Sequence, residues 1–130
     1  MDTYDIYPIA AKDFSLVKGY NMDKNSLECI GKIKASAESL THAAFYEADP
    51  AIKAVIHIHN KELWDNLIDK IPTSKREVPY GTSEMASEIK RLFQETTIQE
   101  QKIMVMGGHD EGIIAFGENL QEAGKVVLNV

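Results

Sequence analysis

The sequence predicts a layered α/β domain whose sheet is mixed or mostly antiparallel. Apolar residues recur along all 130 positions, which is about the length of one domain, so we expect a single domain over residues 1–130. Helical stripes of about 10–13 residues alternate with short β-branched segments, as in layered α/β proteins. A turn-rich hairpin interrupts that alternation, and this argues against a doubly wound parallel sheet.

The first quarter of the chain predicts three weak strands. Residues 5–10 contain Pro8, which favours the edge of a sheet. Residues 15–20 and 27–34 flank the segment 21–25, which is rich in Asn and Asp. Because Asn and Asp favour turns, these two strands should form a hairpin.

The middle of the chain predicts a helix, the clearest strand and a second helix. Ser36 or Ser39 can cap a helix that runs to about residue 48 and ends before Pro50. Residues 54–59 are short and β-branched, as in a buried strand. Asn60 then caps a helix with an apolar stripe, and Pro72 should end it.

The last third predicts two further helices and two strands. Thr82 begins a helix with a stripe of apolar residues, and Asn119 opens the last helix with a capping box. We expect the strands at residues 103–106 and 112–117, on either side of a break at Gly107-Gly108.

Charge and composition exclude several classes of protein. The chain has 14 Lys and Arg against 20 Asp and Glu, a net charge of −6. This disfavours binding to nucleic acid or to an anionic membrane. No apolar run approaches the roughly 18 residues of a membrane span, and the acidic start does not resemble a signal peptide. With Cys29 as its single cysteine, the chain is expected in the reducing cytoplasm.

Three of the four histidines suggest a metal site. His57 and His59 share one face of the predicted strand, where two imidazoles can bind one ion. The same pattern also fits two ordinary core or edge histidines. His109 directly follows Gly107-Gly108, at the end of another strand, and could provide a third ligand. Glu38 is a candidate acid/base group, although an acid at a helix start also suits the helix dipole.

Several short motifs follow one another along the chain. Residues 35–42 read Ala-Ser-Ala-Glu-Ser-Leu-Thr-His, and Tyr46, Pro50 and the Ala-Val-Ile-His-Ile-His strand at 54–59 follow. This resembles the S-S-E-x-x-x-H…Y…P…A-V-x-H-x-H signature of the class II aldolase/adducin family. Residues 78–81 (Val-Pro-Tyr-Gly), His109 after an apolar strand, and residues 116–123 also resemble the family.

The resemblance implies a three-layer α/β/α sandwich with a mixed, largely antiparallel central sheet. It implies a divalent transition metal, usually Zn²⁺, held by His57, His59 and His109, with Glu38 as the acid/base residue and Ser36 binding substrate. The implied function is an aldolase-like lyase in carbohydrate metabolism. It would act on a small hydroxycarbonyl compound through a metal-stabilised enediolate. An epimerase or a dehydratase would use the same intermediate, and family enzymes place active sites near subunit interfaces, so we expect a homo-oligomer.

The chain departs from the family pattern in ways that bear on the substrate. It has no counterpart of the family's Gly-Asn-x-Ser phosphate-binding segment, and Ala37 replaces the second serine of S-S-E. The segment around His109 reads Gly-His-Asp-Glu-Gly where the family usually has Asn-His-Gly. The missing phosphate-binding elements favour an alternative, a non-catalytic metal-binding or interaction module that kept the fold, whereas the retained Glu38 and three histidines oppose it. Among the remaining notable side chains, His42 is expected to pack or to support a ligand rather than to bind the metal, and core positions are expected for Tyr46, Trp64 and Tyr80.

Overall fold

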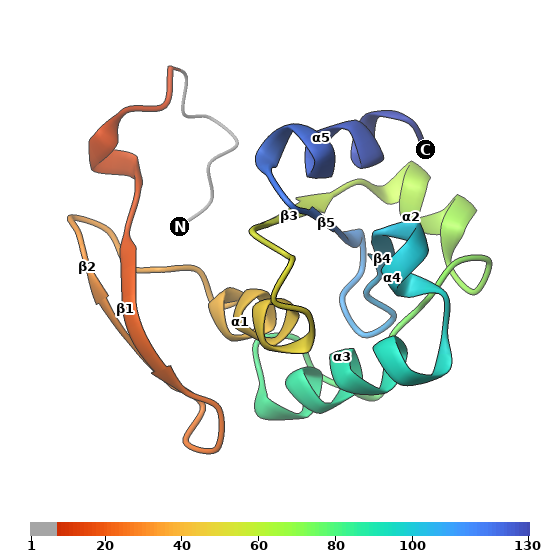
Figure 1. The fold of residues 1–130 in the computed structure, drawn as a ribbon, viewed down its shortest axis with the longest axis horizontal. Helices are drawn as coiled ribbons and strands as arrows, with labels where there is room; N and C mark the ends of the chain where they lie inside the picture. Colours follow the sequence, from red (N-terminus) through yellow and green to blue (C-terminus); the bar gives the residue numbers. More distant parts are fainter. Residues whose placement is uncertain (1–7) are drawn as a thin grey trace.

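The central layer is a three-stranded antiparallel sheet in the order β3-β5-β4. The structure is a computed structural model that describes residues 8–130. The strands are β3 (Ala54–His59), β4 (Ile103–Val105) and β5 (Gly112–Gly117). Helices α1 (Ser39–Ala48) and α3 (Ser83–Glu95) cover one face, and α2 (Lys61–Leu67) and α5 (Leu120–Leu128) cover the other (Figure 1). The expected three-layer α/β/α architecture is therefore confirmed.

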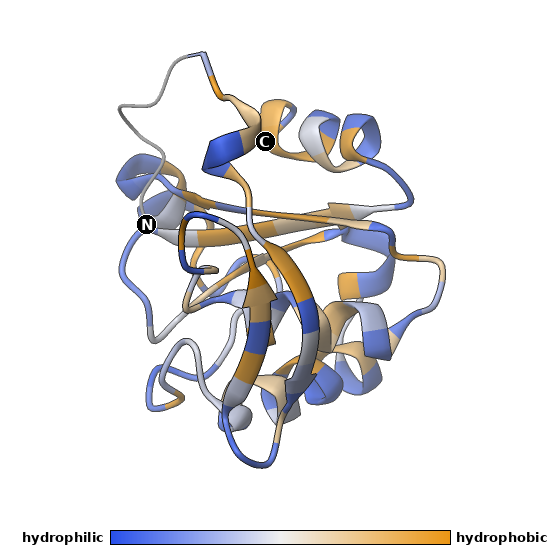
Figure 2. Cartoon of the chain, turned by 90° about the vertical axis from the view of Figure 1, so that its left-hand side faces the viewer, coloured by the Kyte–Doolittle hydropathy of each residue, from blue (hydrophilic) through white to orange (hydrophobic). Residues whose placement is uncertain are grey.

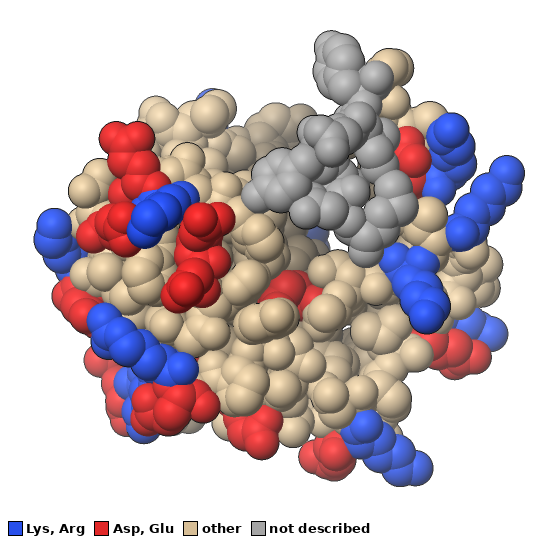
Figure 3. Space-filling view, turned by 180° about the vertical axis from the view of Figure 1, so that it is seen from behind, with Lys and Arg blue, Asp and Glu red and all other residues tan. Residues whose placement is uncertain are grey.

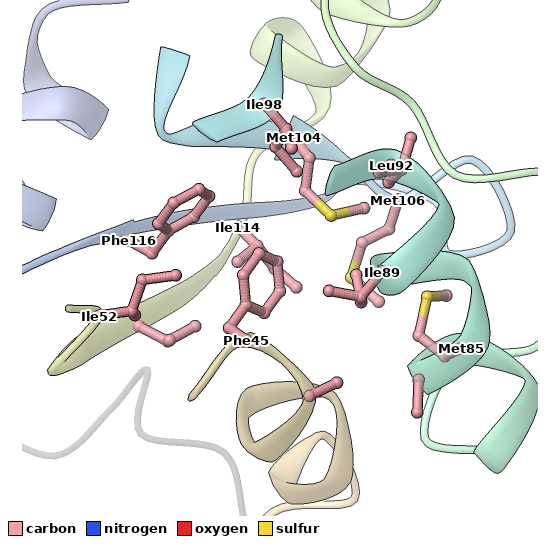
Figure 4. Packing of buried hydrophobic residues seen from close by; sticks show 13 residues of the cluster. Phe45, Ile52, Met85, Ile89, Leu92, Ile98, Met104, Met106, Ile114 and Phe116 are labelled. Carbon is pink, nitrogen blue, oxygen red and sulfur yellow. The ribbon is translucent and has the colours of Figure 1, made fainter. Parts of the chain in front are cut away.

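Alternation along β5 builds a separate core on each face of the sheet. Ile114 and Phe116 pack in the larger cluster with residues of α1, α3 and α4 (Ile98–Gln101), as Figure 4 shows. Ile113 and Ala115 point to the opposite face, where they meet residues of α2 and α5. All four side chains are essentially inaccessible to solvent. Because successive strand residues face opposite sides, one uninterrupted apolar strand serves both cores.

The expected hairpin is present, and it forms a small sheet of its own. Strands β1 (Leu16–Asn21) and β2 (Ser26–Ile30) pair in antiparallel fashion around a turn at residues 22–25. Figure 2 shows this hairpin in front of the central sheet. The second strand ends at Ile30 rather than at residue 34, because the chain turns at Gly31, where a β-carbon would lie 3.0 Å from the Phe14 carbonyl oxygen.

The predicted first strand is not supported where it can be checked. Residues 5–7 of that prediction lie outside the described residues, and residues 8–10 form no strand. A short 3-10 helix (Ala11–Asp13) follows them. The four-residue helix α4, which precedes β4, was not expected, because four residues are too few to show a helical stripe.

Three helix starts follow the predicted capping chemistry. The side chains of Asn60, Thr82 and Asn119 accept hydrogen bonds from backbone N–H groups three residues on. The capping box at α5 is shifted, since the Glu122 carboxylate accepts from the N–H of Glu118 and not from that of Asn119.

Two helix ends differ from the predictions. Helix α2 ends at Leu67, well before Pro72, because Asp69 adopts a left-handed conformation (φ 63°) that stops the helix. Helix α1 begins at Ser39 without a side-chain cap. Over residues 8–130, no helix has the length and apolar character that crossing a bilayer requires.

Candidate metal centre

Three imidazoles meet at one end of the central sheet. One ring nitrogen each from His57, His59 and His109 lies within 4.8 Å of the others. The Nε2 atoms of His59 and His109 are 3.1 Å apart. Two nitrogens bound at 2.0–2.1 Å to one tetrahedral zinc would lie about 3.3 Å apart. The structure thus brings together the three histidines that the sequence singled out, at a spacing that one ion can bridge.

Strand β3 places His57 and His59 without help from loops. The two residues pair with Ile114 and Gly112 of β5 and share a face with the buried Val55. That face is the one covered by α1 and α3, since Val55 belongs to the larger core cluster. The alternation seen in the sequence therefore predicted correctly that both imidazoles point the same way.

The Gly107-Gly108 pair lets the loop that carries His109 pass close to another backbone segment. A β-carbon at Gly107 would lie 2.1 Å from the carbonyl oxygen of Ser74, and one at Gly108 would lie 2.4 Å from that of Val78. The Ser74 hydroxyl also accepts a hydrogen bond from the N–H of Gly107 (3.0 Å). Only glycine fits at these two positions, because any side chain would collide with backbone.

Hydrogen bonds within the loop then aim His109 back toward β3. Its N–H donates to the Met106 carbonyl oxygen (3.2 Å), and its own carbonyl oxygen accepts from the N–H of Gly112 (2.9 Å). The Trp64 indole Nε1–H donates to the same Met106 oxygen (3.0 Å) from helix α2. Gly112 leaves room for the imidazole, since a β-carbon there would lie 2.9 Å from His109 Cδ2.

The electrostatic state of the histidines suits metal binding. Burial, together with the neighbouring His59, His109 and His42, lowers the pKa of His57 to about 4. Burial and His59 also lower the pKa of His109, against the opposing effect of Asp110 and Glu111. Both rings are therefore neutral at pH 7, the form that binds a metal ion.

An orphaned nitrogen supports the fit to a metal. Among the described side chains, His57 Nε2 is buried without a hydrogen-bond partner. A buried polar atom without a partner costs free energy, and a coordinated cation would satisfy it. A donor set of imidazole nitrogens is the chemistry that zinc and related transition metals prefer.

Glu38 is a buried carboxylate at the start of α1. It is only 4% exposed, and neither of its carboxylate oxygens has a hydrogen-bond partner. Burial raises its pKa, while the nearby Thr41 hydroxyl and the His59 ring act in the opposite direction. No hydrogen bond of normal geometry joins Thr41 to the carboxylate, because the Thr41 oxygen is itself unpartnered. The buried hydroxyl three residues after Glu38 was not anticipated from the sequence.

Ser36 fixes the turn that carries Glu38. Its hydroxyl accepts a hydrogen bond from the N–H of Glu38 (3.1 Å), and its carbonyl oxygen accepts from the Ser39 hydroxyl (2.7 Å). Neither serine caps α1 as expected. Ser36 is exposed, so its hydroxyl proton remains available to another acceptor.

The other side chains singled out in the sequence lie in different environments. His42 is half-buried on α1 outside the three-histidine group, and burial lowers its pKa to about 4. Trp64 packs in the smaller core as expected. The expectation of core positions for Tyr46 and Tyr80 is wrong, since they are 42% and 50% exposed. Tyr80 instead stacks on His109, a through-space contact for which the sequence carried no signal.

The arrangement defines a class of protein, an α/β/α domain with a three-histidine site and a buried acid beside it. Residues 5–130 match the class II aldolase and adducin N-terminal domain family, and the chain belongs to this family. Curated protein sequences show no significant match.

The fold is similar to that of a solved structure. This structure is YgbL from Escherichia coli, a proposed aldolase/epimerase/decarboxylase, with 23% identity and a TM-score of 0.56. The alignment covers 81% of this chain and 57% of YgbL, so this chain spans little more than half of that protein.

Proposed function

We propose that the protein is a metal-dependent, aldolase-like lyase that acts on a small hydroxycarbonyl compound. The observation that carries the proposal is the convergence of three imidazoles next to a buried carboxylate without a partner. Membership of the class II aldolase family supports the same chemistry. The proposal includes a role in carbohydrate metabolism and a location in the cytoplasm.

Each residue has a defined part in the proposed reaction. His57, His59 and His109 would hold Zn²⁺ or another divalent transition metal. When bound, the ion would polarise the substrate carbonyl and stabilise the negative charge that develops on its oxygen. Glu38 would accept the proton released next to that carbonyl and later return it. A carboxylate with a raised pKa is suited to both steps near neutral pH.

The region next to Glu38 supports a substrate without a phosphate group. Ser36 can offer one hydroxyl to a substrate oxygen, whereas the exposed Ala37 offers none. Tight binding of phosphate takes several charge-assisted donors. The loop that carries His109 adds two acids, Asp110 and Glu111, which would repel an anionic group.

Elemental analysis followed by proton exchange tests this function. Protein purified without chelator or affinity tag should contain a stoichiometric divalent transition metal. In heavy water, the loaded protein should exchange the carbon-bound protons of a hydroxyketone such as hydroxyacetone, detected by NMR. Glu38→Gln should retain the metal and lose the exchange. Metal binding without exchange would support the non-catalytic module instead, and absence of metal would overturn the site.

We also propose that the protein forms a homo-oligomer through the β1–β2 hairpin. Six of the eleven large hydrophobic side chains identified as exposed lie in residues 9–30, including Phe14, Leu16 and Ile30. Residues 8–34 carry five Lys against three acids, whereas residues 35–130 carry nine Lys and Arg against fifteen acids. Figure 3 shows lysines along the hairpin side of the molecule. Residues 8–34, which expose apolar side chains and carry more Lys than acids, are complementary to the acidic remainder of a second copy.

A further inference from the structure

Tyr80 makes an unusual contact for a half-exposed aromatic residue. Its ring lies nearly parallel to the His109 imidazole, with centroids 4.2 Å apart and an interplanar angle of 24°. The other two histidines meet His109 at steeper angles, 52° for His57 and 90° for His59. Tyr80 is thus the group whose face lies against the His109 ring.

The backbone around Tyr80 is fixed on both sides. Gly81 has φ 68°, and a β-carbon there would lie 2.9 Å from the carbonyl oxygen of Ala37, the neighbour of Glu38. On the other side, the carbonyl oxygen of Val78 approaches Gly108, the neighbour of His109, so closely that a β-carbon there would lie only 2.4 Å away. Residues 78–81 therefore fill the space between the turn that carries Glu38 and the loop that carries His109.

His109 depends on such support more than the other two histidines do. His57 and His59 lie on β3, whose backbone is paired with β5 along its whole length. His109 lies in the loop between β4 and β5, after the last paired residue of β4. Hydrogen bonds fix the backbone of this loop, whereas the orientation of the imidazole depends on its freedom about two side-chain torsions and on its contacts, which include the 3.1 Å approach of its Nε2 to His59 Nε2. The Tyr80 ring lies against the face of the His109 imidazole and restricts its rotation before a metal ion binds.

We propose that Tyr80 is a positioning residue, whose ring holds the His109 imidazole in the orientation that completes the three-histidine metal site. This inference rests on the proposed metal site. The ring face does the positioning, and the phenolic hydroxyl is not needed for it. Residues 78–81 then link the position of His109, the third ligand, to the position of Glu38, the candidate acid/base.

Zinc affinity in a series of variants tests the role of the ring. The probe is Zn²⁺ alone, titrated against a chromophoric chelator, with the wild type, Tyr80→Phe and Tyr80→Ala compared. Loss of a group that orients a metal ligand typically weakens metal binding about 10–100-fold, and we expect this for Tyr80→Ala. Tyr80→Phe keeps the aromatic face and should bind zinc like the wild type. Tyr20→Ala, which removes a tyrosine of similar exposure (43%) from the hairpin, is the matched control and should also bind like the wild type.

A spectroscopic readout separates positioning from general loss of structure. Co²⁺ bound to the wild type and to Tyr80→Phe should give the same visible absorption spectrum, while Tyr80→Ala should give a changed one. Circular dichroism checks that each variant is folded, and Tyr80→Leu replaces Tyr80→Ala if the alanine variant does not fold.

The outcomes distinguish this inference from the proposed function. Absence of zinc binding by the wild type would overturn the metal site itself. Tight binding by both the wild type and Tyr80→Ala, with identical Co²⁺ spectra, would leave the metal site intact and overturn the role of Tyr80. Equal weakening in Tyr80→Phe and Tyr80→Ala would also overturn it, because the hydroxyl and not the ring would then be responsible.

Discussion

Replacing Glu38 with Gln should stabilise the metal-free protein at neutral pH, although it removes the proposed acid/base. The carboxylate is 4% exposed and both of its oxygens lack partners, so its ionised form is poorly solvated in the folded state. Burial accordingly raises its pKa above the ordinary value. An unsatisfied buried polar group costs about 1–3 kcal/mol, and more when it is charged. The amide of Gln has no charge to desolvate.

The sign of the pH dependence follows from the raised pKa. Between the ordinary and the raised value, the folded state holds a proton on Glu38 that the unfolded state has released, so the free energy of unfolding falls as pH rises. The loss is complete above the folded pKa. The advantage of Glu38→Gln should therefore be near zero below the ordinary glutamate pKa and rise with pH, once Glu38 is ionised in the folded state, to the extra cost of burying the charge, on the order of 1–3 kcal/mol.

Thermal melts of chelator-treated protein at pH 4 and pH 7 measure this effect. At pH 7 we expect a midpoint about 3–10 °C higher for Glu38→Gln, from the usual relation between stability and midpoint for a domain of this size. The exposed Glu28→Gln is the matched control and should change stability by less than about 0.5 kcal/mol. A lower midpoint for Glu38→Gln at pH 7, or an equal rise at both pH values, would refute the reasoning.

Three further predictions concern the metal, the substrate and the oligomer. His57→Ala and His59→Ala should each weaken zinc binding by at least tenfold, and His42→Ala much less; equal losses in a chelator titration would mean that His42 is also a ligand. Calorimetry with a metal-chelating hydroxyacetone analogue and its phosphate ester should show little preference, and a hundredfold preference, about 2.7 kcal/mol, would reveal a phosphate pocket. Leu16→Glu combined with Ile30→Glu should convert the oligomer to monomer in light scattering after gel filtration, while a wild-type monomer would exclude the hairpin interface.

The sequence alone determined the parts of the fold that depend on neighbours along the chain. Alternation over residues 54–59 placed His57 and His59 on one face, because the side-chain period of a strand is fixed at two. Asn60, Thr82 and Asn119 marked helix starts, because a capping side chain reaches only the first turn of its own helix. The motifs that carried the family resemblance were likewise short and in order, and the family match confirms them.

Only the tertiary structure decided which residues from distant parts of the sequence are in contact. The sequence gives an aromatic residue at Tyr80, but it does not indicate that this ring stacks on the imidazole of His109, 29 positions later. The same holds for Gly107 and Gly108, whose need for glycine comes from the carbonyl oxygens of a segment about 30 residues earlier. The absence of hydrogen-bond partners around Glu38 also became visible only once the chain had folded over it. Each of these contacts is set by packing between distant segments, for which local propensity and periodicity carry no signal.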